Sequence, residues 1–369
     1  VKAGHKTKGH RFLAPGSVKI READWKKYQA DLKTAHVVLS LEDREKMIRD
    51  GLRHRFAQKF FDEELIRTNA HLVEEPFLMQ GTFSKTYLEL PAEVLASCMK
   101  KNQKIFACYD SKGQLTNRFI AVMNGGRKGL SRIKDDYENV LESRLKDARY
   151  FYEADTRERF ENKQALLEQI VYLGKLGSMK DKTARLEQSA EFFCDLIGRH
   201  DIKDDLKRAA ALSKIDLMTH MVYEFPDLQG IMGREYAIES GEKEEVANAI
   251  GLQYCPKNLG ENYQELAKTF NPLGAMFGII DRLDLLVGAF GSGIDPTGSQ
   301  DPYALRRAAG SIVKIVRAFR FHFSLTEMTE KIAEFYGASL SVAKADWTKR
   351  LRAFLQERVV FELGVKPGT

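Results

Sequence analysis

The sequence has no apolar run that could cross a membrane, and it has few cysteines. No window approaches the ~18 uncharged apolar residues of a transmembrane helix, and the N-terminal segment lacks the apolar stretch of a secretion signal. The four cysteines are scattered without C-x-x-C spacing, at Cys98, Cys108, Cys194 and Cys255. This pattern argues against a zinc site and for buried thiols in a reducing compartment. We therefore expect a cytoplasmic location.

Residue arrangements that carry familiar enzyme chemistry are also missing. The glycine-rich segment 125–129 lacks the spacing and the Lys-Ser/Thr ending of a phosphate-binding P-loop. No Ser/His/Asp or Cys/His set has a pattern that favours nucleophilic catalysis. The sequence therefore gives no reason to assign a catalytic residue to this chain.

The composition is that of a globular protein whose positive charge is concentrated at one end. The 369 residues are 43% hydrophobic and 30% charged, and a chain of this length is expected to form two or three domains. Residues 1–60 hold 15 Lys/Arg against 7 Asp/Glu, whereas the whole chain has a net charge of +6. Such a segment is compatible with a nucleic-acid partner and equally with a surface that is basic for solubility alone.

Hydrophobic periodicity predicts an α+β fold that changes character near residue 125. Residues 1–125 mix helical and strand patterns, and two apolar runs around the turn at 110–113 predict a hairpin. After the glycine-rich break, residues 126–337 are predicted to form a helical domain, and residues 338–369 to begin a further helical region. The predicted helices after the break cover residues 135–173, 180–198, 204–224, 242–251, 274–289, 302–320 and 325–336.

The most distinctive segment is SKIDLMTHMVYEFPDLQGIMGREYA, residues 213–237. Its helical pattern stops at Phe225-Pro226, because proline has no amide hydrogen and restricts the residue before it. Gly230 and Gly233 follow, where the chain can turn or approach another backbone closely. A helix-loop-helix corner without further function would have the same proline and glycine pattern.

The segment also resembles the central motif of the β subunit of tetrameric, bacterial-type glycyl-tRNA synthetase. The matching residues are Lys214, Asp216, Leu217, Thr219, Met221, Val222, Glu224, Phe225, Gln229, Gly230, Met232, Gly233, Tyr236 and Ala237.

Five further motifs that resemble this family follow its order along the chain. They are GHRFL at 9–13, LPAEVL at 90–95, RLKDARYFYEAD at 144–155, LGSMKDKTARL at 176–186 and DPYALRRAA at 301–309. The resemblance therefore covers nearly the whole sequence. It implies a glycine–tRNA ligase subunit that binds tRNA and helps to deliver the acceptor end to an active site in a separate α subunit.

The same resemblance implies the partners and cofactors. The expected partners are the α subunit, in a heterotetramer, and tRNA(Gly). ATP and Mg²⁺ would be used by the α subunit, and this chain, which lacks a class II synthetase motif set, would bind no cofactor and would not activate glycine by itself. Members of the family continue beyond the helix around residue 356 into an anticodon-binding domain, which is why residues 338–369 are expected to begin a further region.

The helical part also resembles the HD phosphohydrolase superfamily, which holds a divalent metal with a His…His-Asp…Asp set. The resemblance implies a degenerate site here, because isoleucine precedes Asp216 and the other histidine positions are also lost. His200-Asp201 lies in a polar connector and is an unsuitable substitute; His220, one turn beyond Asp216, is the one histidine that could restore a ligand set. We predict no bound transition metal and a remnant made of Asp216, Asp281 and Asp284.

Two groups of basic residues are candidate tRNA contacts. In the segment from Asp301, an expected helix N-cap followed by Pro302 at the first helical position, basic side chains recur away from an apolar stripe: Arg306, Arg307, Lys314 and Arg317. They form either a solvated basic face or an edge that contacts phosphates.

The second group lies in the T-x-G-H-R-F motif and comprises Lys6, Lys8 and Arg11. It is either a basic loop whose motif residues hold the fold or an RNA contact. Trp25 and Tyr28 lie among lysines nearby, where a hydrophobic face and base stacking explain them equally well.

These observations lead to one hypothesis and two alternatives. The hypothesis is a β subunit, or part of one, that binds tRNA and supports glycylation by the α subunit. The alternatives are a metal-dependent HD-type phosphohydrolase and a freestanding RNA-binding module.

Overall fold

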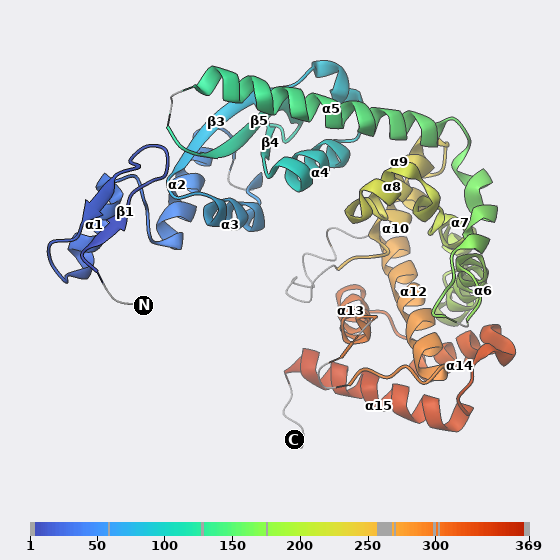
Figure 1. Ribbon diagram of the computed structural model, residues 1–369. Coiled ribbons are helices and arrows are strands. Elements are labelled where there is room, and N and C mark those ends of the chain that lie inside the picture. Colours follow the sequence, from blue (N-terminus) through green and yellow to red (C-terminus); the bar gives the residue numbers. More distant parts are fainter. Residues whose placement is uncertain are drawn as a thin grey trace. The chain divides into compact units, whose positions relative to one another are not determined.

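The computed structural model divides the chain into two compact units, residues 1–152 (unit 1) and 153–369 (unit 2) (Figure 1). A small sheet region precedes a long succession of helices, which confirms the predicted α+β class. No helix in the described part of the chain is long and apolar enough to span a membrane. The structure describes residues 4–57, 60–126, 129–174, 176–256, 268, 271–297, 300, 301 and 303–364.

Unit 1 is built around a three-stranded antiparallel sheet with the order β3-β5-β4. The predicted hairpin is confirmed, since β4 and β5 pair across a turn in which Gly113 adopts a positive φ of 88°. The elements of unit 1 are β1 (Lys6–Lys8), β2 (Ser17–Lys19), α1 (Trp25–Thr34), α2 (Leu41–Arg53), α3 (Glu63–Leu72), β3 (Pro76–Thr82), the 3₁₀ helix η2 (Lys85–Glu89), α4 (Ala92–Gln103), β4 (Phe106–Tyr109), β5 (Leu115–Asn124) and most of α5 (Leu130–Thr156).

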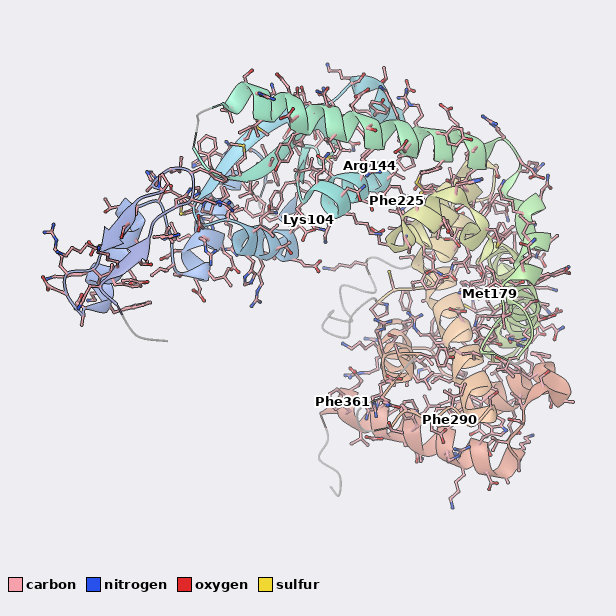
Figure 2. All side chains as sticks on the ribbon, viewed as in Figure 1. Lys104, Arg144, Met179, Phe225, Phe290 and Phe361 are labelled. Atoms are coloured by element: carbon pink, nitrogen blue, oxygen red, sulfur yellow. The ribbon has the colours of Figure 1, made fainter. Side chains whose placement is uncertain are left out.

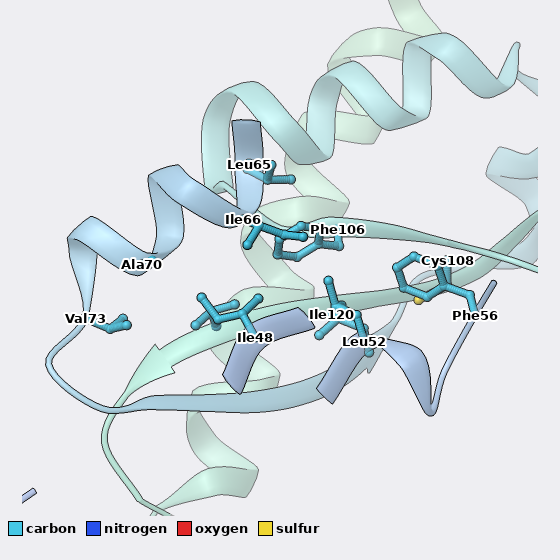
Figure 3. Packing of buried hydrophobic residues seen from close by; sticks show 11 residues of the cluster. Ile48, Leu52, Phe56, Leu65, Ile66, Ala70, Val73, Phe106, Cys108 and Ile120 are labelled. Carbon is cyan, nitrogen blue, oxygen red and sulfur yellow. The ribbon is translucent and has the colours of Figure 1, made fainter. Parts of the chain in front are cut away.

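The core of unit 1 lies between helices α2 and α3 and the sheet (Figure 3). Ile48 and Leu52 occur one turn apart on α2, so both point to one side of that helix, and both are fully buried. They pack in one cluster with Ile66 of α3 and with Phe106 and Ile120 of the sheet. The apolar side of the amphipathic helix at residues 41–53 therefore faces the core of unit 1.

Unit 2 is helical, and its centre is the almost completely buried helix α12 (Pro272–Gly291). Helices α6, α7, α10, α13, α14 and α15 pack against α12, which explains why its sequence is apolar on nearly every side. Beyond residue 130 of the described chain, the pairing Val171↔Ser178 is the sole β-bridge. The other elements of unit 2 are η3 (Phe160–Gln169), α6 (Met179–Ile197), η4 (His200–Ile202), α7 (Lys203–Leu212), η5 (Ile215–Met218), α8 (His220–Glu224), η6 (Pro226–Leu228), α9 (Ile231–Glu239), α10 (Glu244–Leu252), α13 (Leu305–Phe319), α14 (Leu325–Tyr336), η7 (Gly337–Ser339) and α15 (Lys344–Leu363).

The division between the units differs from the predicted boundary at residue 125. The first part of α5 is tied to unit 1, because Glu138 accepts a hydrogen bond from the amide of Thr82 at 2.7 Å and Glu142 accepts one from the hydroxyl of Tyr87 at 2.8 Å. At the other end, residues 338–364 do not form a region of their own. Helix α15 packs on α12 and α13 and buries Trp347.

Two of the predicted helices are interrupted. The stretch 135–173 breaks after Thr156 into the 3₁₀ helix η3, and the stretch 204–224 divides into α7, η5 and α8. The second interruption has a local cause: Thr219 is extended, and its hydroxyl accepts a hydrogen bond from the amide of Val222, which starts a new helix. Periodicity alone does not register such a restart, because the apolar positions continue through it.

Gly81 of β3 gives a test of the unit 1 core. A Cβ at this position would lie 2.2 Å from the ring of Phe119, the fully buried residue opposite it on β5. We therefore predict that Gly81→Ala lowers the free energy of unfolding by about 1–3 kcal/mol through overpacking. Gly125→Ala is the control, since a Cβ there meets no atom within 4 Å. Urea denaturation checks this, and equal midpoints for the two variants would contradict it.

Candidate functional site

The predicted HD remnant lies within unit 2, where the structure places ammonium groups against its carboxylates. Asp281 and Asp284 lie one turn apart on α12. Nζ of Lys182, on α6, is 3.0 Å from Asp281 and 2.9 Å from Asp284. Nζ of Lys214, just before η5, is 3.1 Å from Asp281. The two lysines therefore neutralise the carboxylates from two different elements.

Further hydrogen bonds complete this buried charge cluster around Asp284. Nε of Arg185 donates to the carboxylate at 2.9 Å and the hydroxyl of Tyr172 donates to it at 3.3 Å. The hydroxyl of Tyr336, on α14, donates to the backbone carbonyl of Asp284 at 2.9 Å. Because the Asp284 side chain is fully buried, this complete set of partners is what allows a charge to remain there.

The pKa directions follow from burial and from these partners. Burial by itself would raise the pKa of Asp281, but the ammonium groups of Lys182 and Lys214 hold it well below its ordinary value. Burial lowers the pKa of Lys214, with Asp281 opposing the shift and Lys182 adding to it. The neighbouring ammonium groups therefore outweigh burial at Asp281 and favour its charged form.

Asp216 has a different environment, although it belongs to the same predicted remnant. It is completely buried on η5, and its carboxylate accepts a hydrogen bond at 2.5 Å from the amide of Gly230. Gly230 has a positive φ of 83°, and a Cβ on Gly233 would lie 3.2 Å from the same carboxylate. Burial raises the pKa of Asp216 to about 6, against the effect of the Gly230 hydrogen bond. Gly230 is thus explained by its positive φ and the ring of Tyr254 beside it, and Gly233 by the close approach of Ile250 and of the Asp216 carboxylate.

The metal that the HD superfamily binds does not fit these residues. Within the described ranges, no group of three or more His, Cys, Asp or Glu is placed to hold a metal ion. Asp281 already faces two ammonium groups, and a divalent cation beside them would be repelled. The site geometry thus gives no support to the phosphohydrolase alternative, and the expected absence of a transition metal stays a prediction.

The two histidines considered for the remnant are placed elsewhere. His220 donates its backbone amide to Asp155 at 2.9 Å, and its Nδ1 lies 2.8 Å from the same carboxylate. Asp155 is buried and also accepts hydrogen bonds from the amide of Met221 and the hydroxyl of Tyr236. It therefore fixes the end of α5 to the start of α8. His200 lies in the exposed turn η4, with Nδ1 3.1 Å from Asp195.

Sequence reasoning missed Lys182, Arg185 and Asp155 as members of buried networks. A signal for the first two exists in α6, where the buried positions are Lys182, Thr183, Arg185, Leu186, Ser189, Ala190, Phe193 and Cys194. Basic residues at the helical spacing of an apolar stripe indicate buried ion pairs. Their partners lie about a hundred residues later in the chain, so the sequence does not reveal which carboxylates they meet.

The structure separates the basic residues of the α13 segment by their exposure. Arg307 and Arg317 are exposed, whereas Lys314 is buried, with Nζ 3.7 Å from Glu362 of α15. The prediction that Lys314 lies with them on an accessible basic face is therefore wrong, because α15 covers its part of α13. Arg306 is half-buried, and its guanidinium donates to the carbonyl of Thr297.

The predicted N-terminus of α13 also needs correction. The helix begins at Leu305, and the carboxylate of Asp301 reaches it from the preceding loop to accept from the amides of Leu305 and Arg306, at 2.7 and 3.1 Å. Asp301 thus caps the helix without occupying the N-cap position. Pro302 lies outside the described residues.

In the N-terminal motif, fold-holding residues alternate with accessible ones. His10 is fully buried, and Gly9 has no room for a Cβ, which would lie 2.7 Å from the carbonyl of Ala14. Lys6, Lys8 and Arg11 are all exposed. The two alternatives, a loop that holds the fold and an RNA contact, are therefore compatible, because the buried residues serve the first and the exposed residues are available for the second.

Asp216 generates a pH prediction. Its folded pKa of about 6 lies above the ordinary value of 3.8, so between these pH values the folded protein keeps a proton that the unfolded chain has lost. The contribution of Asp216 to the free energy of unfolding therefore falls as pH rises. We predict that the free energy of unfolding of Asp216→Asn, relative to that of the wild type, increases by about 1–3 kcal/mol as the pH rises from 4 to 7. Urea denaturation across this range measures it, with the exposed Asp346→Asn as control; parallel wild-type and Asp216→Asn profiles would contradict it.

Comparison with known proteins gives a consistent set of relatives. Residues 1–365 match the family described as glycyl-tRNA synthetase beta subunit. The chain is 40% identical over 344 residues to the glycine–tRNA ligase beta subunit of Moorella thermoacetica, covering 91% of this chain and 48% of that protein. Identity to the Bacillus subtilis beta subunit is 37% over 371 residues, or 99% and 52% of the two chains. For the Clostridioides difficile beta subunit it is 38% over 357 residues, or 96% and 51%. The chain thus spans about half the length of these relatives.

Proposed function

The chain belongs to the glycyl-tRNA synthetase β-subunit family, and from this premise we propose that it binds tRNA(Gly) and supports glycylation of that tRNA by an α subunit. The observation that carries the proposal is the family match over residues 1–365. In this assignment the α subunit uses ATP and Mg²⁺ and performs the chemistry. This chain contributes binding and positioning, which accelerate a reaction by holding its components in place.

The buried charge cluster supports the assignment of the chemistry to the α subunit and of binding to this chain. Lys182 and Lys214 are paired with carboxylates of α12, and neither side chain is exposed by more than a few per cent. A group that acts on a substrate has to reach it. The cluster therefore serves the stability of unit 2, and contact with RNA falls to the surface.

The surface offers accessible cations for phosphate contacts. Lys6, Lys8 and Arg11 are exposed in unit 1, and Arg307 and Arg317 are exposed in unit 2. Guanidinium and ammonium groups on a surface contact the RNA backbone, which carries no sequence information. These side chains would supply affinity, whereas selection of the tRNA would depend on other contacts.

Reconstitution with an α subunit tests the proposed function. A bacterial glycyl-tRNA synthetase α subunit should copurify with this chain, and the mixture should glycylate tRNA(Gly) faster than the α subunit alone. The chain alone should give no glycyl-tRNA, because the proposal assigns the chemistry to the α subunit. Binding of tRNA without copurification or stimulation would favour a freestanding RNA-binding module instead.

The accessible arginines of α13 give a second prediction. Because each phosphate contact releases counterions, Arg307→Ala/Arg317→Ala should weaken tRNA binding and make the slope of log K against log salt shallower by about 1–2 units. The matched control is Lys331→Ala/Lys344→Ala, which removes the same charge from α14 and α15.

Lys314→Ala should behave differently from both the arginine double variant and the lysine double control. It leaves Glu362 without its buried partner, so we expect a lower free energy of unfolding and an unchanged salt slope. Filter binding over a salt series gives the slopes. Equal slopes for the wild type and the folded double arginine variant would remove α13 from the proposed interface.

A further inference from the structure

A cavity of about 550 Å³ opens in unit 1 beside the N-terminal loop. Its walls come from that loop, the end of α3, the end of β5 and the start of α5, and they include the apolar side chains of Leu13, Val122 and Ile133. Two further lining residues, Phe12 and Leu72, are 73% and 61% exposed. The cavity is in the size range of small-molecule and side-group pockets, and its rim is apolar where surfaces are usually polar.

The exposed position of Phe12 is built into the structure. Nδ1 of the buried His10 accepts hydrogen bonds from the amides of Phe12 and Leu13, at 3.1 and 3.2 Å. Nε2 of the same ring lies 2.9 Å from the side-chain oxygen of Asn124, at the end of β5. The backbone that carries Phe12 is thereby fixed to the sheet. Together with the exposed Leu72 of the same cavity, this ring forms an apolar surface patch, and such patches mark interaction sites.

The charge around the cavity indicates the chemistry of that partner. Lys104, which follows α4 (Figure 2), is the single charged residue among the lining residues that the structure describes. Over residues 4–33, eight Lys/Arg stand against three Asp/Glu. Lys6 and Lys8 point to one side of β1, and Lys19 lies directly opposite Lys6 on β2. All three are exposed, so the approach to the cavity favours a polyanion.

Polar groups in the wall favour a nucleobase over a purely apolar group. The side-chain amide of Gln103 is buried, and neither its oxygen nor its nitrogen has a hydrogen-bond partner among the described residues. A glutamine amide offers one donor and one acceptor side by side, which matches the edge of adenine. Tyr137 of α5 adds a second aromatic ring to the lining.

We propose that this cavity takes one unpaired purine base of an RNA strand, with Phe12 stacking on it and the lysines of β1 and β2 contacting the adjoining phosphates. The proposal rests on the proposed function, in which the chain binds tRNA. It adds that part of the bound RNA is single-stranded at this point, because a base within a duplex has no free face or edge to offer.

The test compares two RNA hairpins that carry the same single-stranded 3′ tail, with adenines in one and abasic sites at the same positions in the other. The phosphate charge is equal in both, so the difference in affinity isolates the base. Wild-type protein should bind the adenine tail about 5- to 150-fold more tightly, the range expected for one stacked base. Phe12→Ala should abolish this preference, and Phe12→Tyr should keep it.

A second readout and a matched control separate stacking from loss of charge or of fold. Phe12→Ala should leave the slope of log K against log salt unchanged, because it removes no cation. Trp25→Ala removes another exposed aromatic of unit 1, one 64% exposed and outside the cavity lining, and it should keep the adenine preference. Thermal unfolding of each variant checks that unit 1 remains folded.

Four outcomes would overturn the proposal. If the wild type binds both hairpins equally, or Phe12→Ala keeps the adenine preference, the cavity does not take a base, while tRNA binding still stands. If the chain self-associates through Phe12 and the adenine preference is absent, the rim is an interface between two copies. If neither hairpin nor tRNA(Gly) binds at any salt concentration, the proposed function fails together with this inference.

Discussion

Unit 2 depends on the ion pairs that Lys182 and Lys214 make with Asp281 and Asp284 at the centre of the helical packing. Each charge is removed from water, which costs several kcal/mol on the order of magnitude usual for buried ions. The cost is offset because every carboxylate meets an ammonium or guanidinium group within about 3 Å. The network joins α6, the segment before η5 and α12, so three distant parts of the sequence are held in one arrangement.

This cluster also explains why the predicted HD-type remnant does not fit a divalent metal beside α12. The carboxylates of α12 face Lys182 and Lys214, which supply positive charge through covalently attached groups. The position of the charge is then fixed by folding alone and does not depend on a metal concentration. Asp216 instead accepts a hydrogen bond from the Gly230 amide, where the chain turns with a positive φ.

Unit 1 combines fold-holding and accessible residues within one short motif. His10 uses both ring nitrogens inside the structure, and the same hydrogen bonds leave Phe12 and Arg11 on the surface. Mutating His10 would therefore disturb the presentation of its neighbours as well as the fold. The exposed residues Phe12 and Lys6 can be changed separately, so effects on the proposed RNA contact can be measured apart from effects on stability.

The sequence by itself determined the α+β class, the β4–β5 hairpin, the order of most helices and the family, because these follow from local periodicity, turn residues and contiguous motifs. It also named Asp216, Asp281 and Asp284 as one remnant, whereas the structure pairs Asp281 and Asp284 with lysines and Asp216 with the Gly230 amide. Only the tertiary structure decided which charges are accessible. A helical pattern places Arg307, Lys314 and Arg317 on one side of α13, but α15, which covers Lys314, comes from residues 344–363. Likewise Lys182 pairs with carboxylates about a hundred residues away. Most of α5 belongs to unit 1 because Glu138 and Glu142 accept hydrogen bonds from β3 and η2. A residue is buried when another part of the chain packs against it, and for these residues the segment that packs against them lies far away in the sequence.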